Sequence, residues 1–346
     1  MKILMISADP LALLQTSGVC GRLRTYAKGL TWLHVLVPSK ITAKKQIGPL
    51  TVEGVGGGSL LSRFRMCRYM PEETPDLISA QDPFEFGFAA WCIAKRTHVP
   101  FELQVHTDIF SPYFVRHSWK NMLRVRMARF LLPRASRIRV VSERIHQSIT
   151  QQFSSLDVPI AVVPVSISTG EVLSPDPQPY HIVAVSRLAS EKDLPTLLRA
   201  FKEVYTRIPK ARLSIVGDGP CRGALLQLAE SLGISNAVSF VGWVDDPREY
   251  YSRAFVFVQT SLFEGYGRSI VEAAIARVPI VTTDVGVVGY ELESRGVVVV
   301  PFKDPVQLAC ALTEQLDSPV LPVPPLIVDP KESIRRIHRA WGITTT

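Results

Sequence analysis

The chain has 346 residues, 47% hydrophobic and 20% charged, with a formal net charge of +8 at pH 7. This length suits two domains with real cores, and no stretch approaches the roughly 20 uninterrupted apolar residues of a membrane span. The five cysteines are widely spaced and contain no C-x-x-C pair. This spacing argues against a disulfide framework and a structural zinc site.

The positive charge is concentrated in the first half of the chain. Residues 1–166 contain 21 Lys and Arg against 11 Asp and Glu, a balance of +10, whereas residues 167–346 contain 18 against 20, a balance of −2. This asymmetry predicts an anionic partner, either nucleic acid or anionic lipid.

Two basic segments, 60–70 and 113–139, interleave arginines with bulky apolar residues. That mixture is typical of an amphipathic helix on an anionic membrane surface. The alternative is an ordinary helix whose arginines are solvated. The usual nucleic-acid-binding motifs are absent, so we expect membrane contact rather than nucleic acid.

In the first half, short apolar strands alternate with helical segments. We expect strands at 2–8, 32–38, 77–81, 101–107, 138–142 and 160–168, and helices at 21–30, 82–98 and 119–135.

The second half follows the proline-rich segment 173–180, a predicted hinge. We expect strands at 181–188, 238–244, 254–260, 279–283 and 296–301, a strand followed by a turn at 211–220, and helices at 193–208, 221–233, 268–277 and 331–343. Strand–helix alternation on this spacing predicts parallel, doubly wound sheets, with ligands at the carboxyl ends of the strands.

One stretch in the second half predicts an anion site. After the strand 254–260 the chain reads "EGYGRSIVE", in which Glu264 and Glu272 lie on either side of a glycine turn. Gly265 and Gly267 permit positive φ and a close approach of backbone to a ligand. The helix from Arg268 would present its N–H groups and positive dipole end, to which the arginine adds charge.

These residues predict a nucleotide-binding site. The ribose hydroxyls of a nucleotide would contact Glu272, its diphosphate the helix start, and a hydroxyl-rich group Glu264. In "SRLASEK", Arg187 and Lys192 follow the strand 181–188 and could neutralise a diphosphate. The alternatives are that the two glutamates are solvated helix residues and that the cations are ordinary surface charges.

The motifs resemble those of the retaining GT-B glycosyltransferases of family 4, also called glycosyl transferases group 1. The motifs "SRLASEK" and "VGDGP" precede the E-x7-E match "EGYGRSIVE" in the order that the family shows. The similarity is firmest over residues 180–300. In the first half, "DLISAQDPFEFGFAAW", "QVHTD" and "IRVVSERI" also look similar to the family.

The resemblance implies an α/β GT-B fold, with two Rossmann-like doubly wound domains facing a cleft. An acceptor-binding domain would span residues 1–168 and a nucleotide-sugar donor-binding domain residues 169–330, with a last helix in 331–346 crossing back onto the first. The chain departs from the family in its separated glycines Gly18 and Gly21, in the loop "DVGVVGYEL", and in the proline tract before the last helix.

The resemblance also assigns site residues. The implied catalytic residues are His106, Arg187, Lys192 and Glu264. The implied donor-binding residues are Arg187, Lys192, Gly217, Glu264, Gly265, Tyr266, Gly267, Arg268 and Glu272. The implied acceptor and cleft residues are Gly21, which would open the first helix, with Arg22, His106 and Asp108. For His106 the alternative is a plain packed histidine at a strand end.

The implied activity is a retaining transfer of a hexose-type sugar from a nucleotide-diphosphate sugar to a hydroxyl of a glycan or lipid-linked acceptor, in envelope or polysaccharide biosynthesis. No D-x-D motif occurs, which is consistent with a site that needs no metal or cofactor. The enzyme would be cytoplasmic, in solution or at the inner face of the membrane.

Other functions remain open. A GT-B nucleotide-sugar epimerase, a phosphorylase of the same architecture, and a non-catalytic nucleotide-sugar-binding subunit are the alternatives. A NAD-dependent enzyme is disfavoured because no G-x-G-x-x-G follows the first strand. The sequence leaves the donor base, the sugar, the acceptor and the linkage undetermined.

Overall fold

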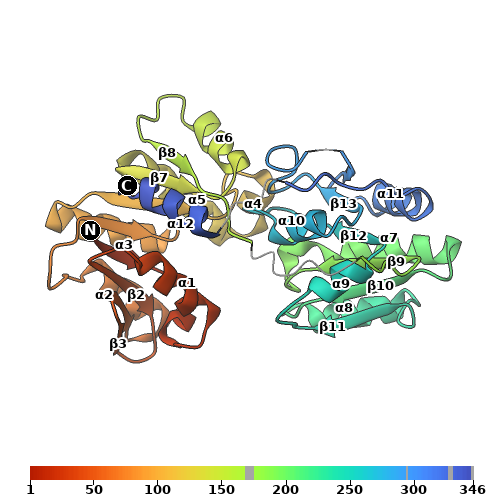
Figure 1. Cartoon of the computed structure of the whole chain (residues 1–346), viewed down its shortest axis with the longest axis horizontal. Coiled ribbons are helices and arrows are strands. Elements are labelled where there is room, and N and C mark those ends of the chain that lie inside the picture. Colours follow the sequence, from red (N-terminus) through yellow and green to blue (C-terminus); the bar gives the residue numbers. More distant parts are fainter. Residues whose placement is uncertain (168–174, 294, 326–329, 344–346) are drawn as a thin grey trace. The chain divides into compact units, whose positions relative to one another are not determined.

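The computed structural model describes residues 1–167, 175–293, 295–325 and 330–343. The chain divides into two compact units (Figure 1). Unit 1 contains Met1–Val141, Ile145–Pro164 and Asp329–Thr346, and unit 2 contains Ser142–Arg144 and Val165–Val328. The predicted domain boundary at residues 168 and 169 lies outside the described residues, as do residues 344–346 of the predicted last helix.

Unit 1 contains an eight-stranded sheet in the order β3-β4-β2-β1-β5-β6-β7-β8. Its strands are β1 Lys2–Ile6, β2 Trp32–Pro38, β3 Ala43–Ile47, β4 Leu50–Val55, β5 Leu77–Ala80, β6 Phe101–Val105, β7 Arg137–Val140 and β8 Ile160–Val162. All neighbouring pairs are parallel except β3 and β4. The predicted parallel sheet is thus confirmed except at this edge, where β3 and β4 form a hairpin and Gly48 takes a positive φ of 58° in its turn.

The helical segments of unit 1 and its boundary are η1 Pro10–Leu13, α1 Gly18–Ala27, α2 Gly58–Cys67, α3 Glu85–Thr97, α4 Pro112–His117, α5 Trp119–Leu131, η2 Leu132–Arg134, α6 Glu143–Gln152 and α12 Pro330–Ala340. The prediction that Gly21 opens the first helix is wrong, because α1 begins at Gly18. The Ser17 hydroxyl accepts the Cys20 N–H at 3.1 Å and caps this earlier start.

The last helix, α12, belongs to unit 1, where it appears in dark blue (Figure 1). The carbonyl of Tyr26 on α1 is 3.1 Å from the His338 ring. Trp341, just after α12, is 1% exposed and stacks edge-on against Tyr26. These contacts anchor the end of the chain.

Unit 2 contains a six-stranded parallel sheet in the order β11-β10-β9-β12-β13-β14. Its strands are β9 His181–Val185, β10 Arg212–Val216, β11 Val238–Gly242, β12 Val256–Gln259, β13 Ile280–Thr283 and β14 Val297–Val300. Its helical segments are η3 Ser190–Lys192, α7 Leu194–Arg207, α8 Arg222–Ser231, α9 Arg248–Arg253, α10 Arg268–Ile275 and α11 Pro305–Asp317. Both sheets have the doubly wound strand order that the sequence predicts.

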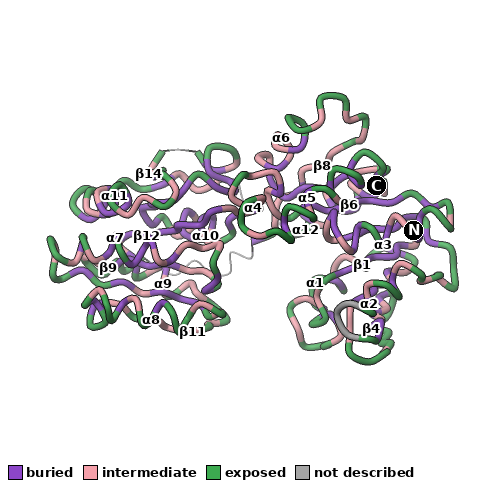
Figure 2. The backbone as a smooth tube through the Cα atoms, turned by 180° about the vertical axis from the view of Figure 1, so that it is seen from behind, coloured by how far each residue is buried: buried purple, intermediate pink, exposed green. Residues whose placement is uncertain are grey.

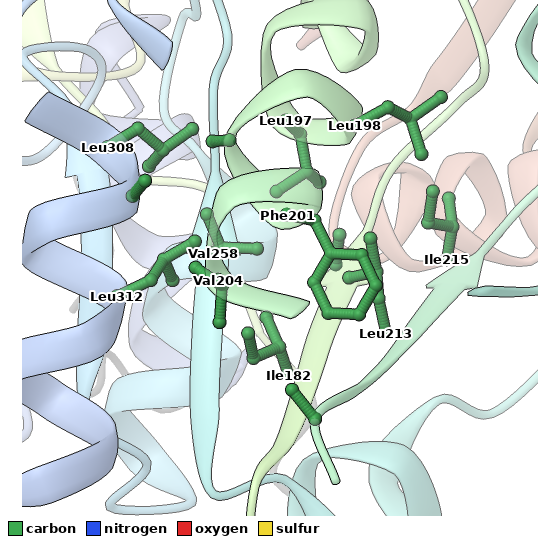
Figure 3. Packing of buried hydrophobic residues seen from close by; sticks show 14 of the residues in the cluster. Ile182, Leu197, Leu198, Phe201, Val204, Leu213, Ile215, Val258, Leu308 and Leu312 are labelled. Atoms are coloured by element: carbon green, nitrogen blue, oxygen red, sulfur yellow. The ribbon is translucent and has the colours of Figure 1, made fainter. Parts of the chain in front are cut away.

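The inner strands of both sheets are largely buried, as their purple colour in Figure 2 shows, whereas the edge strands β3, β8 and β11 are not. On one face of the second sheet, Phe201 of α7 packs among Ile182, Leu213 and Val204 (Figure 3). Among the described residues, no helix combines the length and apolar character that crossing a bilayer requires.

We expect Phe201→Ala to lower the free energy of unfolding of unit 2 by about 3–5 kcal/mol, because it removes a fully buried ring and leaves a cavity. Native-state hydrogen exchange of the β9 and β10 amides measures this change within unit 2. Leu226→Ala is the control, since Leu226 on α8 is 40% exposed. Equal losses in the two variants would contradict this account of the core.

Candidate active site

The candidate site lies where the strand order of unit 2 reverses. Strands β9 and β12 are parallel neighbours, so the loops after both strands leave the same edge of the sheet. In doubly wound sheets this position is the one that binds ligands. The loop after β9 carries Arg187 and Lys192, and the loop after β12 carries Glu264.

These two loops are hydrogen-bonded to each other. The Leu262 N–H donates to the Glu191 carbonyl at 2.8 Å, and the Thr260 hydroxyl donates to the Lys192 carbonyl at 2.8 Å. The structure thus fixes two motifs about seventy residues apart in the sequence against each other.

Glu264 is the centre of a polar cluster. Its Oε1 atom forms an ion pair with Lys192 Nζ and accepts hydrogen bonds from Gln259 Nε2 at 2.9 Å and from the Ser261 hydroxyl at 2.8 Å. In the described part of the chain, no donor reaches Oε2. One carboxylate oxygen therefore holds Glu264 in place while the other is available to accept a ligand hydroxyl.

Glu272 is oriented by two donors. Tyr251 donates its hydroxyl to Oε2 at 2.9 Å, and Arg268 pairs with Oε1 at 2.6 Å. Burial, followed by the charge of Glu272, raises the pKa of Tyr251 well above its ordinary value, so its hydroxyl keeps the proton. The Arg268 side chain is 59% exposed, so a ligand hydroxyl could replace it at small cost.

Arg187 is not joined to the Glu264 cluster by any contact in the described part of the chain. It pairs with Glu191 and is 68% exposed. Burial acts to raise the pKa of Glu191, but the hydrogen bond and charge of Arg187 outweigh it and lower that pKa. The exposed guanidinium can therefore turn toward an anion without breaking a buried contact.

The glycine turn before α10 is held by its backbone conformation and by its backbone hydrogen bonds. Gly267 takes a positive φ of 82° at the N-cap of α10, and the Gly265 carbonyl accepts the Ser142 hydroxyl at 2.8 Å. The Tyr266 carbonyl accepts the Val287 N–H at 2.9 Å. The helix start predicted at Arg268 is confirmed.

Gly217 lets the loops after β9 and β10 pack closely. Its φ is 130°, and a Cβ there would lie 2.0 Å from the Ser186 carbonyl oxygen. One residue on, the Leu188 N–H donates to the Asp218 carbonyl at 2.9 Å. The close approach is thus between two parts of the backbone.

The predicted residues of unit 1 lie at separate places. His106 and Asp108 follow β6, and Asp108 accepts the Ser148 hydroxyl at 2.7 Å. Gly21 and Arg22 are exposed on α1. Nothing lies within 4 Å of a Cβ built at Gly21, so packing places no demand on a glycine there.

Asp82, after β5, is a candidate that the sequence analysis missed. Its Oδ1 accepts the N–H groups of Phe84 at 2.8 Å and Phe86 at 3.3 Å, at the start of α3. Burial raises its pKa to about 6. A perturbed carboxyl group at the carboxyl edge of a sheet is a candidate functional group.

Within residues 1–167, 175–293, 295–325 and 330–343, no cluster of three or more His, Cys, Asp or Glu side chains is arranged to hold a metal ion.

Two protein-family models match most of the chain. The model described as "Glycosyl transferases group 1" matches residues 179–318, and that described as "Glycosyl transferase 4-like domain" matches residues 23–166. The chain belongs to the glycosyl transferases group 1 family. The family, retaining and of GT-B fold, is the one that the sequence motifs predicted, and that prediction is confirmed.

Two curated proteins illustrate the relationship. The chain is 36% identical over 113 residues to the poly(glycerol-phosphate) alpha-glucosyltransferase of Bacillus subtilis, which covers 33% of this chain and 17% of that protein. It is 37% identical over 104 residues to the alpha-monoglucosyldiacylglycerol synthase of Acholeplasma laidlawii, covering 30% and 26%. The chain therefore spans less than a third of the length of these relatives.

Solved structures resemble the chain over almost its whole length. Sucrose-phosphate synthase from Thermosynechococcus elongatus gives a TM-score of 0.76 at 17% identity and covers 98% of this chain and 95% of that one. Anabaena Alr3699/HepE in complex with UDP and glucose gives 0.69 at 19% identity, covering 99% and 94%. These likenesses confirm the predicted GT-B fold.

We expect Gly217→Ala to lower the melting temperature of the protein, because the new Cβ would collide with the Ser186 carbonyl at a φ that favours glycine. The loss should be at least about 2 kcal/mol, with backbone strain alone contributing about 1–3. Differential scanning calorimetry measures it. Gly223→Ala on α8 is the control, since nothing lies within 4 Å of its Cβ; a similar effect at both positions would refute the packing argument.

Proposed function

We propose that this chain is a retaining glycosyltransferase that moves a hexose-type sugar from a nucleotide-diphosphate sugar to a hydroxyl of a glycan or lipid-linked acceptor. The observation that carries the proposal is the Lys192–Glu264 ion pair. This pair lies between the loops after β9 and β12, where the strand order of unit 2 reverses and doubly wound folds bind ligands. The chain's membership in the glycosyl transferases group 1 family supports the same function.

Each part of the donor has a proposed partner in unit 2. Glu272 accepts the ribose hydroxyls. The N-terminus of α10, Arg187 and Lys192 hold the diphosphate. Glu264 accepts hydroxyls of the sugar through Oε2, while its Oε1 stays bonded to the protein. Arg187 and Lys192 stabilise the negative charge that develops as the diphosphate departs.

In the proposed reaction the acceptor hydroxyl attacks the anomeric carbon from the face that the diphosphate leaves. The C–O bond to the diphosphate breaks, a new glycosidic bond forms, and a leaving phosphate oxygen takes the hydroxyl proton. The protein contributes positioning and charge stabilisation. Its two cations and the helix start perform the role that a divalent metal would have, so we propose a metal-independent site.

A uridine donor is the first to test. Among the similar structures, one of Anabaena Alr3699/HepE contains UDP-glucose. GDP- and ADP-sugars are tested beside it, because none of the proposed donor contacts involves the base. An epimerase would need no acceptor, and a binding subunit would bind a donor without cleaving it; these outcomes separate the alternatives.

The acceptor side has an apolar pocket. A cavity of about 770 Å³ opens between α2, α3 and α5, and its lining includes Leu61, Phe64, Phe88 and Met127. These side chains suit the hydrocarbon part of an amphiphilic acceptor. Two relatives are alpha-monoglucosyldiacylglycerol synthases, which supports a lipid-linked acceptor for this chain.

The surface around this pocket is cationic and apolar. Phe64, Trp119, Met122 and Leu123 are between 51% and 67% exposed. The helices α2 and α5, within the basic segments 60–70 and 113–139, carry arginines beside these side chains, whereas Arg139 at the end of the second segment is buried. We therefore propose peripheral contact with an anionic membrane, without nucleic acid as a partner, for an enzyme of the cytoplasm or the inner membrane face.

We expect Lys192→Met to lower kcat/KM for transfer or donor hydrolysis by about 10²–10³-fold, because it removes a cation that stabilises the leaving diphosphate. The assay screens UDP-, GDP- and ADP-sugars in the presence of EDTA. Lys202→Met is the control and should leave the rate unchanged, because Lys202 lies on α7, ten residues after Lys192 in the sequence and outside the Glu264 cluster. Equal rates in both variants, or a complete dependence on added metal, would contradict the proposed site.

We expect the protein to sediment with vesicles containing anionic phosphatidylglycerol, and to do so less with phosphatidylcholine alone or at high salt. Arg126→Glu on α5 changes the net charge of the basic face by two units. At about 1 kcal/mol per charge, this should weaken vesicle binding by about 10- to 30-fold. Arg222→Glu on α8 of unit 2 is the control. Binding that is insensitive to lipid charge would argue against this membrane face.

A further inference from the structure

A chain of hydrogen bonds in the core of unit 1 ends at His106. Its members lie on neighbouring parallel strands, with Ser79 on β5, Glu102 and Gln104 on β6, and Arg139 on β7. Ser79 and Glu102 are 0% exposed and Gln104 is 1% exposed. Buried polar side chains are in most cases hydrogen-bonded, and the donors and acceptors of these residues set the direction of the bonds between them.

The direction is set by Glu102. Its Oε1 accepts the Ser79 hydroxyl at 2.8 Å and the Trp341 indole N–H at 3.2 Å, and it lies 3.6 Å from Arg139 Nε in a buried ion pair. A carboxylate can only accept hydrogen bonds. The single hydroxyl hydrogen of Ser79 must therefore point to Glu102.

The donor in each of the remaining hydrogen bonds between Ser79 and His106 follows from this direction. Because Ser79 has already used its hydrogen, its oxygen can only accept from Gln104 Nε2, which lies 2.8 Å away. This contact orients the amide, whose two ends are assigned from the hydrogen-bond network. The Gln104 Oε1 atom then faces His106 Nε2 at 3.0 Å. Since that oxygen is an acceptor, His106 must carry a hydrogen on Nε2.

We infer that Gln104 is a positioning residue that holds His106 as the Nε2–H tautomer, so that Nδ1 presents a lone pair to a hydroxyl of the sugar substrates. The inference rests on the proposed glycosyl transfer for the identity of that hydroxyl. A neutral imidazole with a bare Nδ1 accepts a hydrogen bond, and it neither donates one from Nδ1 nor attracts a phosphate.

The charge state agrees with this geometry. Burial of the ring by surrounding protein, and next the positive charge of Arg139, lower the pKa of His106 below its ordinary value. By its solvent-accessible surface, however, His106 is an exposed residue at the end of β6, so the first effect is weaker than complete burial would give. Both causes favour the neutral ring at pH 7.

The buried ion pair is better explained by this ordering than by stability. Replacing a buried ion pair with packed apolar side chains is often neutral or stabilising. Among the described residues, the Glu102 Oε2 atom and the Arg139 Nε atom have no hydrogen-bond partner. The ion pair keeps Glu102 as an acceptor, and this fixes which atom donates in each hydrogen bond from Glu102 to His106.

Nitrogen-15 NMR of the histidine rings in the full-length, ligand-free protein tests the inference, with the His106 signals assigned by their loss in His106→Gln. We expect a protonated Nε2 and an unprotonated Nδ1 at pH 7. Gln104→Met removes the acceptor at similar volume and should give a mixture of tautomers. Gln46→Leu on the exposed strand β3 is the control and should leave the pattern unchanged.

Ser79→Ala provides a second variant if Gln104→Met fails to fold. It lets the Gln104 amide turn over, so it should also mix the tautomers, and it should lower kcat by about fivefold, in line with a hydrogen bond of about 1 kcal/mol, while nucleotide affinity is unchanged. An Nδ1–H tautomer in the wild type, or an unaltered pattern in both variants, overturns the inference. Because the spectrum needs no turnover, an inactive protein with the expected tautomer would contradict only the proposed function.

Discussion

The parallel pairing of β9 with β12 is the constraint on which the candidate site depends. Parallel neighbours end at the same edge of a sheet, so the loop that carries Lys192 and the loop that carries Glu264 leave the sheet side by side. The two side chains are only 17% and 15% exposed, and their charges are largely removed from water. An ion pair in such a place is weak evidence for stability, and its position at the ligand-binding edge of the fold gives it a functional explanation.

A common principle links the charges of the proposed donor site. Lys192 pairs with Glu264, Arg187 with Glu191, and Arg268 with Glu272, so each cation has an internal anion. A diphosphate that takes up Arg187 and Lys192 would draw them from Glu191 and Glu264, and the N-terminus of α10 would supply further positive potential. The two arginines, 68% and 59% exposed, can change partners at small cost, whereas the more buried Lys192 is held in place beside Glu264, the residue proposed to bind the sugar.

The sequence predicted the parts of the fold that local patterns determine. Strands such as 32–38 and the helix start at Arg268 are confirmed because apolar runs and glycine turns specify them locally. The hairpin of β3 and β4 was missed because Ala43–Ile47 is polar and reads as a loop. Tyr251 and Gln259 were missed for a different reason: they act through tertiary contacts with Glu272 and Glu264. The one available signal was that Gln259 ends a buried strand with a polar side chain.

The most direct test of the central claim is the anomeric configuration of the sugar that the enzyme releases. A UDP-α-hexose is incubated with the protein in EDTA, and proton NMR follows the slow hydrolysis of the donor before the free sugar mutarotates. A retaining, metal-independent site predicts that the α anomer appears first and that EDTA does not stop the reaction. Release of the β anomer first, or donor binding without any cleavage even in the presence of acceptors, would contradict the account.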